Sequence, residues 1–157
     1  MTALLQKSES SLYDTDFYAW TQDQSAKFRA RAGFDNRGDI DWENAAEEIE
    51  SMGRRERREI ASRLNLVLTH LLKWRFQPTH RSRSWRGTIR EQRRMLHKVL
   101  DDSPSLASFP AEIVAEEYAA AVLVASGETG LEPDVFPATC PFLIDDVLNP
   151  EFLPEDE

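Results

Sequence analysis

Apolar residues recur at helical spacing from near the start of the chain. Phe17, Trp20 and Phe28 fall three or four positions apart, or multiples of that, which predicts a helix over about residues 15–32. Gly33 ends this predicted helix, and a run of turn-forming residues follows it.

The next helix is predicted to begin after Asp41, whose carboxylate can accept the unpaired backbone N–H groups of a helix start. Its buried stripe would comprise Trp42, Ala45, Ala46, Ile49 and Met52. At Gly53 two alternatives stay open, because this glycine is either a C-cap or a residue within one longer helix. A further helix over 54–76 has its core row at Ile60, Leu64, Val67, Leu68 and Leu71, and Pro78 prevents its continuation.

Two more helices are predicted in the second half. One is capped by Ser84, and its inward face comprises Trp85, Ile89, Gln92, Leu96 and Val99. The other spans about 111–126, ends at Gly127 and buries Ile113, Val114, Ala121, Val122 and Ala125.

The segment from Glu128 onward contains several prolines, which exclude long regular structure. It is too apolar for free coil, so we expect it to lie packed across the helices, with one helical turn at 145–148. No stretch has the pattern of a strand of clear length. The sequence therefore predicts an all-α fold, a compact bundle of four to five helices with a packed Pro-rich C-terminal segment. We expect one domain over 1–157, with 1–11 and 154–157 flexible.

Composition agrees with a folded, soluble protein: of the 157 residues, 41% are hydrophobic and 30% are charged. The N-terminus has no basic stretch followed by an apolar run, so we expect no signal peptide, and no apolar run is long enough to cross a bilayer. The single cysteine, Cys140, cannot form an internal disulfide and is expected to be an ordinary thiol. These features predict a cytoplasmic location.

Charge is distributed unevenly along the chain. Residues 54–98 hold fourteen Lys and Arg against three acids, whereas no Lys or Arg follows Lys98 and fourteen acids do. The net charge of −9 therefore conceals a basic middle between acidic ends. Either the ends neutralise the middle, or the middle is a surface for an anionic partner.

A series of short motifs resembles one bacterial family along nearly the whole chain, from about Leu12 to Pro154. The matching stretches are Glu47–Gly53, Glu56–Ile60, His70–Trp74, Gln77-Pro78, Arg83–Trp85, Ser103–Leu106, Glu128–Leu131, Phe136-Pro137, Cys140-Pro141 and Phe152–Pro154. In that order and spacing the chain resembles the family catalogued as domain of unknown function twenty-nine. Arg55 departs from the small polar residue common there. The resemblance implies a helical bundle in a bacterial cytoplasm and implies no activity or catalytic residue.

The first candidate surface surrounds the loop at Pro78. Trp74, Phe76 and Trp85 flank this loop and could form an exposed aromatic anchor, because Trp and Arg are enriched at the centres of protein interfaces. The arginines around this anchor would be Arg75, Arg81 and Arg83.

The second candidate is a basic row at i, i+4 spacing, formed by Arg86, Arg90, Arg94 and Lys98. It could contact phosphates, or it could pair with Glu112, Glu116 and Glu117 on the next helix.

Metal and catalytic sites are not predicted. Carboxylate metal bundles contain Glu-x-x-His pairs, and the chain has no such pair among Glu47, Glu48, Glu50, His70 and His97. The three glutamates are explained without a metal, because negative charge near a helix start stabilises the helix. No nucleophile elbow or phosphate-binding glycine loop occurs. The sequence therefore predicts no metal and no cofactor.

The favoured interpretation is a non-enzymatic module that binds a protein, possible self-association included, through its basic and aromatic surface. Nucleic-acid binding through the Arg86 row is the alternative, and an enzyme of unrecognised type comes third. No membrane partner is expected.

Overall fold

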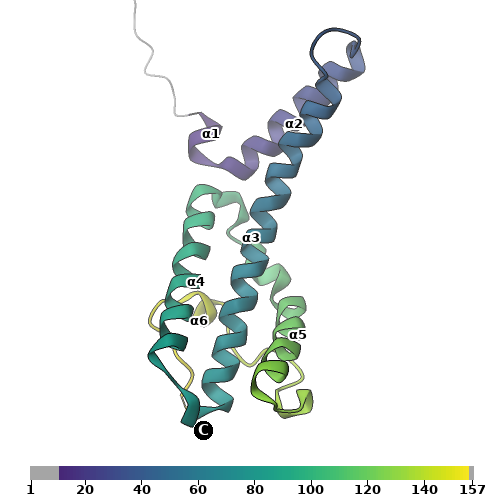
Figure 1. Ribbon diagram of the computed structural model, residues 1–157. Helices are drawn as coiled ribbons and strands as arrows, with labels where there is room; N and C mark the ends of the chain where they lie inside the picture. Colours follow the sequence, from purple (N-terminus) through teal and green to yellow (C-terminus); the bar gives the residue numbers. More distant parts are fainter. Residues whose placement is uncertain (1–10, 156–157) are drawn as a thin grey trace, which may run out of the picture. The chain divides into compact units, whose positions relative to one another are not determined.

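The computed structural model describes residues 11–155, and within this range the chain is all-α with no strand, as predicted. It divides into two units. One holds the residues up to Glu56 together with Asp102–Ser105, and the other holds Arg57–Asp101 together with the residues from Leu106 onward. The prediction of one domain stays a prediction. Figure 1 labels the helices.

The first unit contains α1 (Leu12–Thr15), α2 (Phe17–Phe34) and the beginning of α3 (Trp42–Phe76). The carboxylate of Asp16 caps α2 by accepting the backbone N–H of Ala19 at 3.0 Å. The predicted helix over 15–32 is therefore confirmed, with both ends shifted by two residues. The predicted cap of α3 is also confirmed, because Asp41 accepts the N–H of Asn44 at 3.1 Å.

Helix α3 runs through Gly53 without a break, which decides between the two alternatives left open there. Gly53 is buried, and a Cβ at this position would lie 2.5 Å from Thr21 Oγ1 and 3.1 Å from Gln22 Nε2 on α2. The glycine therefore lets α2 and the first part of α3, which lie side by side in Figure 1, approach closely.

The second unit is built from the rest of α3, α4 (Arg83–Asp102), α5 (Phe109–Thr129) and α6 (Ile144–Leu148), with the short 3₁₀ turns η1 (Pro78–His80) and η3 (Pro133–Val135); a third turn, η2 (Pro104–Leu106), precedes α5. Its core confirms the row predicted on α3, which is fully buried: Ile60, Leu64, Val67, Leu68 and Leu71. Tyr118, Ala121 and Ala125 of α5 and Ile89 of α4 pack against these residues.

The ends of α4 and α5 differ from the predicted ones. Helix α4 begins at Arg83, and its cap is Ser82, whose Oγ accepts the N–H of Trp85 at 3.1 Å. The prediction that Ser84 is the cap is wrong, because Ser84 already lies within the first helical turn. Helix α5 continues past Gly127 to Thr129 and ends at Gly130, whose φ of 76° is the left-handed conformation that glycine adopts most easily.

The segment after Gly130 packs as predicted. Phe136, Phe142 and Val147 are buried in the core of the second unit, and α6 supplies the expected helical turn. Pro154, which was expected to begin a flexible tail, is buried. Of the other residues expected to be flexible, Ser11 and Glu155 are described and exposed, and 1–10 and 156–157 lie outside the described range.

Candidate functional site

Five basic residues of α4 form a solvent-exposed face, which we call the α4 basic face: Arg83, Arg86, Arg90, Arg94 and Lys98. They recur three or four positions apart, so their side chains emerge along one side of the helix. Arg94 pairs with Glu91 of the same helix at 2.7 Å. Exposed pairs of this kind are worth about 0–1 kcal/mol and leave the face strongly basic.

The glutamates of α5 do not neutralise this face. Glu112 accepts a hydrogen bond from Ser108 Oγ at 3.1 Å, and Glu117 accepts one from Asn65 Nδ2 of α3 at 3.3 Å. Within residues 11–155, neither these two nor Glu116 forms an ion pair with the α4 basic face. In the second unit, the acidic C-terminal half instead reaches α3, where Glu128 pairs with Lys73 at 2.9 Å.

Trp74 lies beneath arginines and does not project into solvent. Its side chain is only 7% exposed, and the guanidinium carbons of Arg81 and Arg86 lie 5.1 and 5.4 Å from its ring centroid. Arg81 also donates its Nε–H to the carbonyl of Trp74 at 2.7 Å. The expectation of an exposed Trp74 anchor is therefore wrong, because the ring gains more from core packing and cation–π contacts than from exposure.

The other two aromatic residues of the predicted anchor are half-buried. Phe76 meets Phe136 edge to face at a centroid distance of 5.2 Å, so it belongs to the core. The ring of Trp85 lies 4.7 Å from Lys73 Nζ. The surface of this region is consequently made by arginines, with aromatic rings below them.

Two cavities border the beginning of α4. The Ser82 cavity has a volume of about 430 Å³ and is lined by Trp74, Arg81, Ser82, Arg83 and Arg86. The Arg93 cavity measures about 260 Å³, and its lining comprises Arg86, Ile89, Arg90, Arg93, Pro150, Glu151 and Leu153. Arg86 lines both cavities. Of the nine predicted site residues, the fold thus brings Trp74, Arg81, Arg83 and Arg86 around one cavity.

The remaining predicted residues lie elsewhere in the second unit. Arg90 lines the Arg93 cavity, and Arg94 stands further along the helix beside Glu91. Arg75 lines a different cavity and places its guanidinium 5.6 Å from the ring of Phe76.

Arg93 is a structural residue that the sequence pattern did not single out. Its side chain is 1% exposed and donates three hydrogen bonds to backbone carbonyls: Nε to Val147 at 2.8 Å, Nη1 to Phe152 at 2.7 Å and Nη2 to Asp146 at 3.1 Å. Burial lowers the pKa of Arg93 to about 10, which still leaves it charged at pH 7. It lies four residues after Ile89 and three before Leu96, so helical periodicity carried a signal for its burial.

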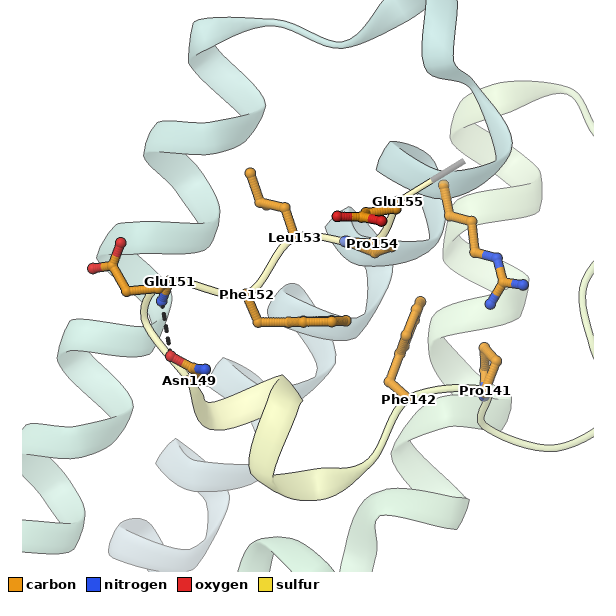
Figure 2. A pocket seen from close by; sticks show the side chains of 9 residues that line it. Pro141, Phe142, Asn149, Glu151, Phe152, Leu153, Pro154 and Glu155 are labelled. Atoms are coloured by element: carbon orange, nitrogen blue, oxygen red, sulfur yellow. Dashed lines mark hydrogen bonds between the residues drawn. The ribbon is translucent and has the colours of Figure 1, made fainter. Parts of the chain in front are cut away.

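A larger cleft of about 690 Å³ lies along the C-terminal segment (Figure 2). The rings of Phe142 and Phe152 stand edge to face there at 6.3 Å, and the N–H of Glu151 donates to Asn149 Oδ1 at 3.0 Å. Leu153, Pro154 and Glu155 complete that side of the cleft in the close-up. The polar groups of this cleft do not form a nucleophile with an adjacent base, so its geometry suggests no reaction.

Burial shifts the pKa values of three groups outside the α4 basic face, His70, Cys140 and Tyr118. Burial lowers the pKa of His70 below its ordinary value of 6.5, and its Nδ1 lies 2.9 Å from the carbonyl oxygen of Leu66 in its own helix. Burial also raises the pKa of the Cys140 thiol and raises that of Tyr118 to about 12. Within the described range, no group of three or more His, Cys, Asp or Glu side chains could hold a metal ion.

Comparison with known proteins places this fold in a family. The family described as "Domain of unknown function DUF29" matches residues 12–153. The chain belongs to this family. The resemblance seen in the short motifs is thus confirmed, and the match spans both units of this DUF29 protein.

A solved relative has the same fold. It is an alpha-helical protein of unknown function from Rhodospirillum rubrum, with 26% identity and a TM-score of 0.75. The similarity covers 92% of this chain and 93% of the other. No curated protein matches the sequence. In the described part of the DUF29 chain, none of the helices is both long and apolar enough to cross a membrane.

Proposed function

We propose that this DUF29 protein is a non-enzymatic interaction module that recognises an acidic protein through the α4 basic face. The observation that carries the proposal is the exposure of this face. Its arginines project from one side of a helix whose opposite side is fixed in the core by Ile89 and Leu96. A basic surface on a rigid helix accelerates encounter with an acidic partner and favours it over basic ones.

The distribution of ion pairs supports the proposal. Arg63 pairs with Glu59 one turn away on α3 at 2.9 Å, and Lys73 pairs with Glu128. Arg83, Arg86, Arg90 and Lys98 have no ion-pair partner among residues 11–155. The acidic residues within 11–155 therefore leave the α4 basic face available, which favours an external anionic partner over internal neutralisation.

A protein fits this surface better than a nucleic acid does. Single-stranded nucleic acids gain affinity by stacking bases on exposed aromatic rings, and Trp74 is covered by Arg81 and Arg86. The net charge of −9 also disfavours the approach of a long polyanion. Arginine is, in contrast, enriched among the residues that contribute most to protein–protein binding.

Nucleic-acid binding is the second candidate, and the continuous spacing of Arg86, Arg90, Arg94 and Lys98 is the observation that favours it. Such a row can follow a phosphate backbone, and its affinity would fall steeply with salt. Self-association is a variant of the first candidate, in which acidic segments of one copy meet the α4 basic face of another.

The test is a pull-down with tagged full-length protein at native expression level, with and without nuclease. Captured protein is identified by mass spectrometry, and nucleic acid is detected by staining. The charge-reversal pair Arg86→Glu, Arg90→Glu is compared with the matched pair Arg55→Glu, Arg58→Glu on α3. All four residues are exposed, so each variant should keep its helical content by circular dichroism.

A protein partner that survives nuclease and is lost only in the α4 pair supports the proposal. Material lost on nuclease treatment promotes the second candidate. Recovery of the bait alone, with a monomer in sedimentation analysis, refutes both the acidic-partner proposal and its self-association variant.

A further inference from the structure

We infer that the Ser82 cavity binds a phosphate monoester, supplied by a phosphorylated serine or threonine side chain of the acidic partner. The inference rests on the proposed function and specifies the chemistry of one subsite within it. It is carried by three features of this cavity: the charges in its lining, the donors at the start of α4, and the aromatic ring that the arginines cover.

Among residues 11–155, the lining of the cavity contains three arginines and no carboxylate. The Nε–H of Arg81 is held by the carbonyl of Trp74, which fixes the position of this guanidinium at the cavity. Arg83 and Arg86 are exposed, and neither pairs with a described acid. Guanidinium groups form bidentate hydrogen bonds with phosphate oxygens, and these charge-assisted bonds are about twice as strong as neutral ones.

The start of α4 adds neutral donors to the same cavity. The Ser82 hydroxyl oxygen accepts the N–H of Trp85, and Ser82 O accepts the N–H of Arg86, which leaves the Ser82 O–H able to donate outward. The backbone N–H groups of Arg83 and Ser84 lie in the first turn of α4, where the helix offers no carbonyl to accept their hydrogen bonds. A twenty-residue helix also carries partial positive charge at this end, which favours an anion.

The base of the cavity is an aromatic ring that lies beneath two arginines. Trp74 forms its floor with 7% exposure, and the guanidinium groups of Arg81 and Arg86 lie over that ring. A phosphate monoester carries close to two negative charges at pH 7 and three acceptor oxygens, whereas a Glu or Asp carboxylate carries one charge and two oxygens. The dianion therefore makes fuller use of the donors around the cavity.

Binding is tested by nuclear magnetic resonance on the ¹⁵N-labelled full-length protein. Three probes are titrated separately: N-acetyl-O-phosphoserine amide, N-acetylglutamate amide and thymidine 5′-phosphate. Saturable shifts are expected for the amides of Arg83 and Ser84 and for the Nε–H signals of Arg83 and Arg86. Phosphoserine should bind at least about tenfold more tightly than the glutamate probe.

Two further readouts separate a specific site from general attraction. Arg83→Gln and Arg86→Gln should each weaken phosphoserine binding about tenfold, whereas Arg94→Gln removes the same charge from the same helix outside the cavity and should have little effect. The affinity should also fall as the pH drops below the second phosphate pKa of about 6, because the probe then loses a negative charge.

The outcomes distinguish this inference from the proposed function. Equal binding of the glutamate probe, absence of saturable shifts, or unchanged binding in both Arg83→Gln and Arg86→Gln overturns the phosphate site. The acidic-partner proposal would nevertheless stand if the captured protein still depends on Arg86 and Arg90. Tighter binding of thymidine 5′-phosphate than of phosphoserine overturns the phosphoprotein assignment in favour of a nucleotide source.

Discussion

Replacing Arg93 with methionine should destabilise the protein far more than the same change at its neighbour Arg94. Arg93 holds three backbone carbonyls around α6 and the segment after it, those of Asp146, Val147 and Phe152. Methionine fills a similar volume and donates no hydrogen bond. The change therefore removes the donors and disturbs the packing little.

The size of the effect follows from the surroundings of each carbonyl. The bond to Val147 is buried, and an unsatisfied buried acceptor costs about 1–3 kcal/mol. The bonds to Asp146 and Phe152 are partly accessible, so water can replace the lost donors at about 0.5–1.5 kcal/mol each. The variant also no longer buries a charge, and the desolvation penalty that this avoids offsets part of the loss in stability. We expect Arg93→Met to lower the free energy of unfolding by about 2–4 kcal/mol, a large share of the 5–15 kcal/mol typical of a domain.

Urea unfolding followed by circular dichroism measures this difference. Arg94→Met is the matched control, because its side chain is 61% exposed and pairs only with surface residues, and it should change the unfolding free energy by no more than about 1 kcal/mol. Hydrogen exchange should also speed up in residues 146–153 of Arg93→Met. If the two variants unfold within about 0.5 kcal/mol of each other, the assigned role of Arg93 is refuted.

Three further predictions concern residues outside the α4 basic face. Gly53→Ala should destabilise the protein by about 1–3 kcal/mol, because the added Cβ would meet the buried Thr21. The control Gly87→Ala on α4 places its Cβ in open space and should stabilise the protein by up to about 1 kcal/mol. Equal effects of the two changes in thermal unfolding would contradict the role of Gly53 in the close approach of α2 and α3. The pKa of His70 is lower in the folded protein than its ordinary value of 6.5, so the unfolded chain binds a proton more readily as the pH falls below 6.5. The free energy of unfolding should therefore decrease as the pH drops toward 5. His70→Gln should remove this part of the pH dependence of the unfolding free energy, measured by urea titrations. Cys140 should react with a disulfide reagent more slowly in the folded protein than in urea, because burial raises its pKa, and equal rates would contradict its partial burial.

Periodicity was sufficient to predict most helices and the core row of α3, because apolar residues repeated along one face of a helix are buried only when that face packs against the core. It could not decide the role of Gly53. A glycine followed by Arg54 and Arg55 is compatible with a helix end, whereas the structure shows a glycine within the helix that makes room for Thr21, more than thirty positions away in the chain. The local sequence contains no record of that contact.

The candidate site was predicted in part. The exposed row on α4 follows directly from i, i+4 spacing, and the structure places all four members of that row in solvent. The burial of Trp74 depends on the path of the loop that brings Arg81 back over its ring, and no local pattern specifies that path. Arg93 was missed because arginine is rarely buried, and the carbonyls that compensate its charge lie more than fifty residues later.

Site-specific photo-crosslinking tests the central claim most directly, namely that the α4 basic face is the recognition surface. A benzoylphenylalanine at Gly87 lies between Arg83 and Arg90 on the helix, has open space around its Cβ and leaves every arginine in place. The matched position is Leu123 of α5, an apolar side chain that is 66% exposed and lies on another helix of the second unit. The account predicts that the captured partner crosslinks from position 87 and not from position 123. Crosslinking from position 123 alone would contradict it.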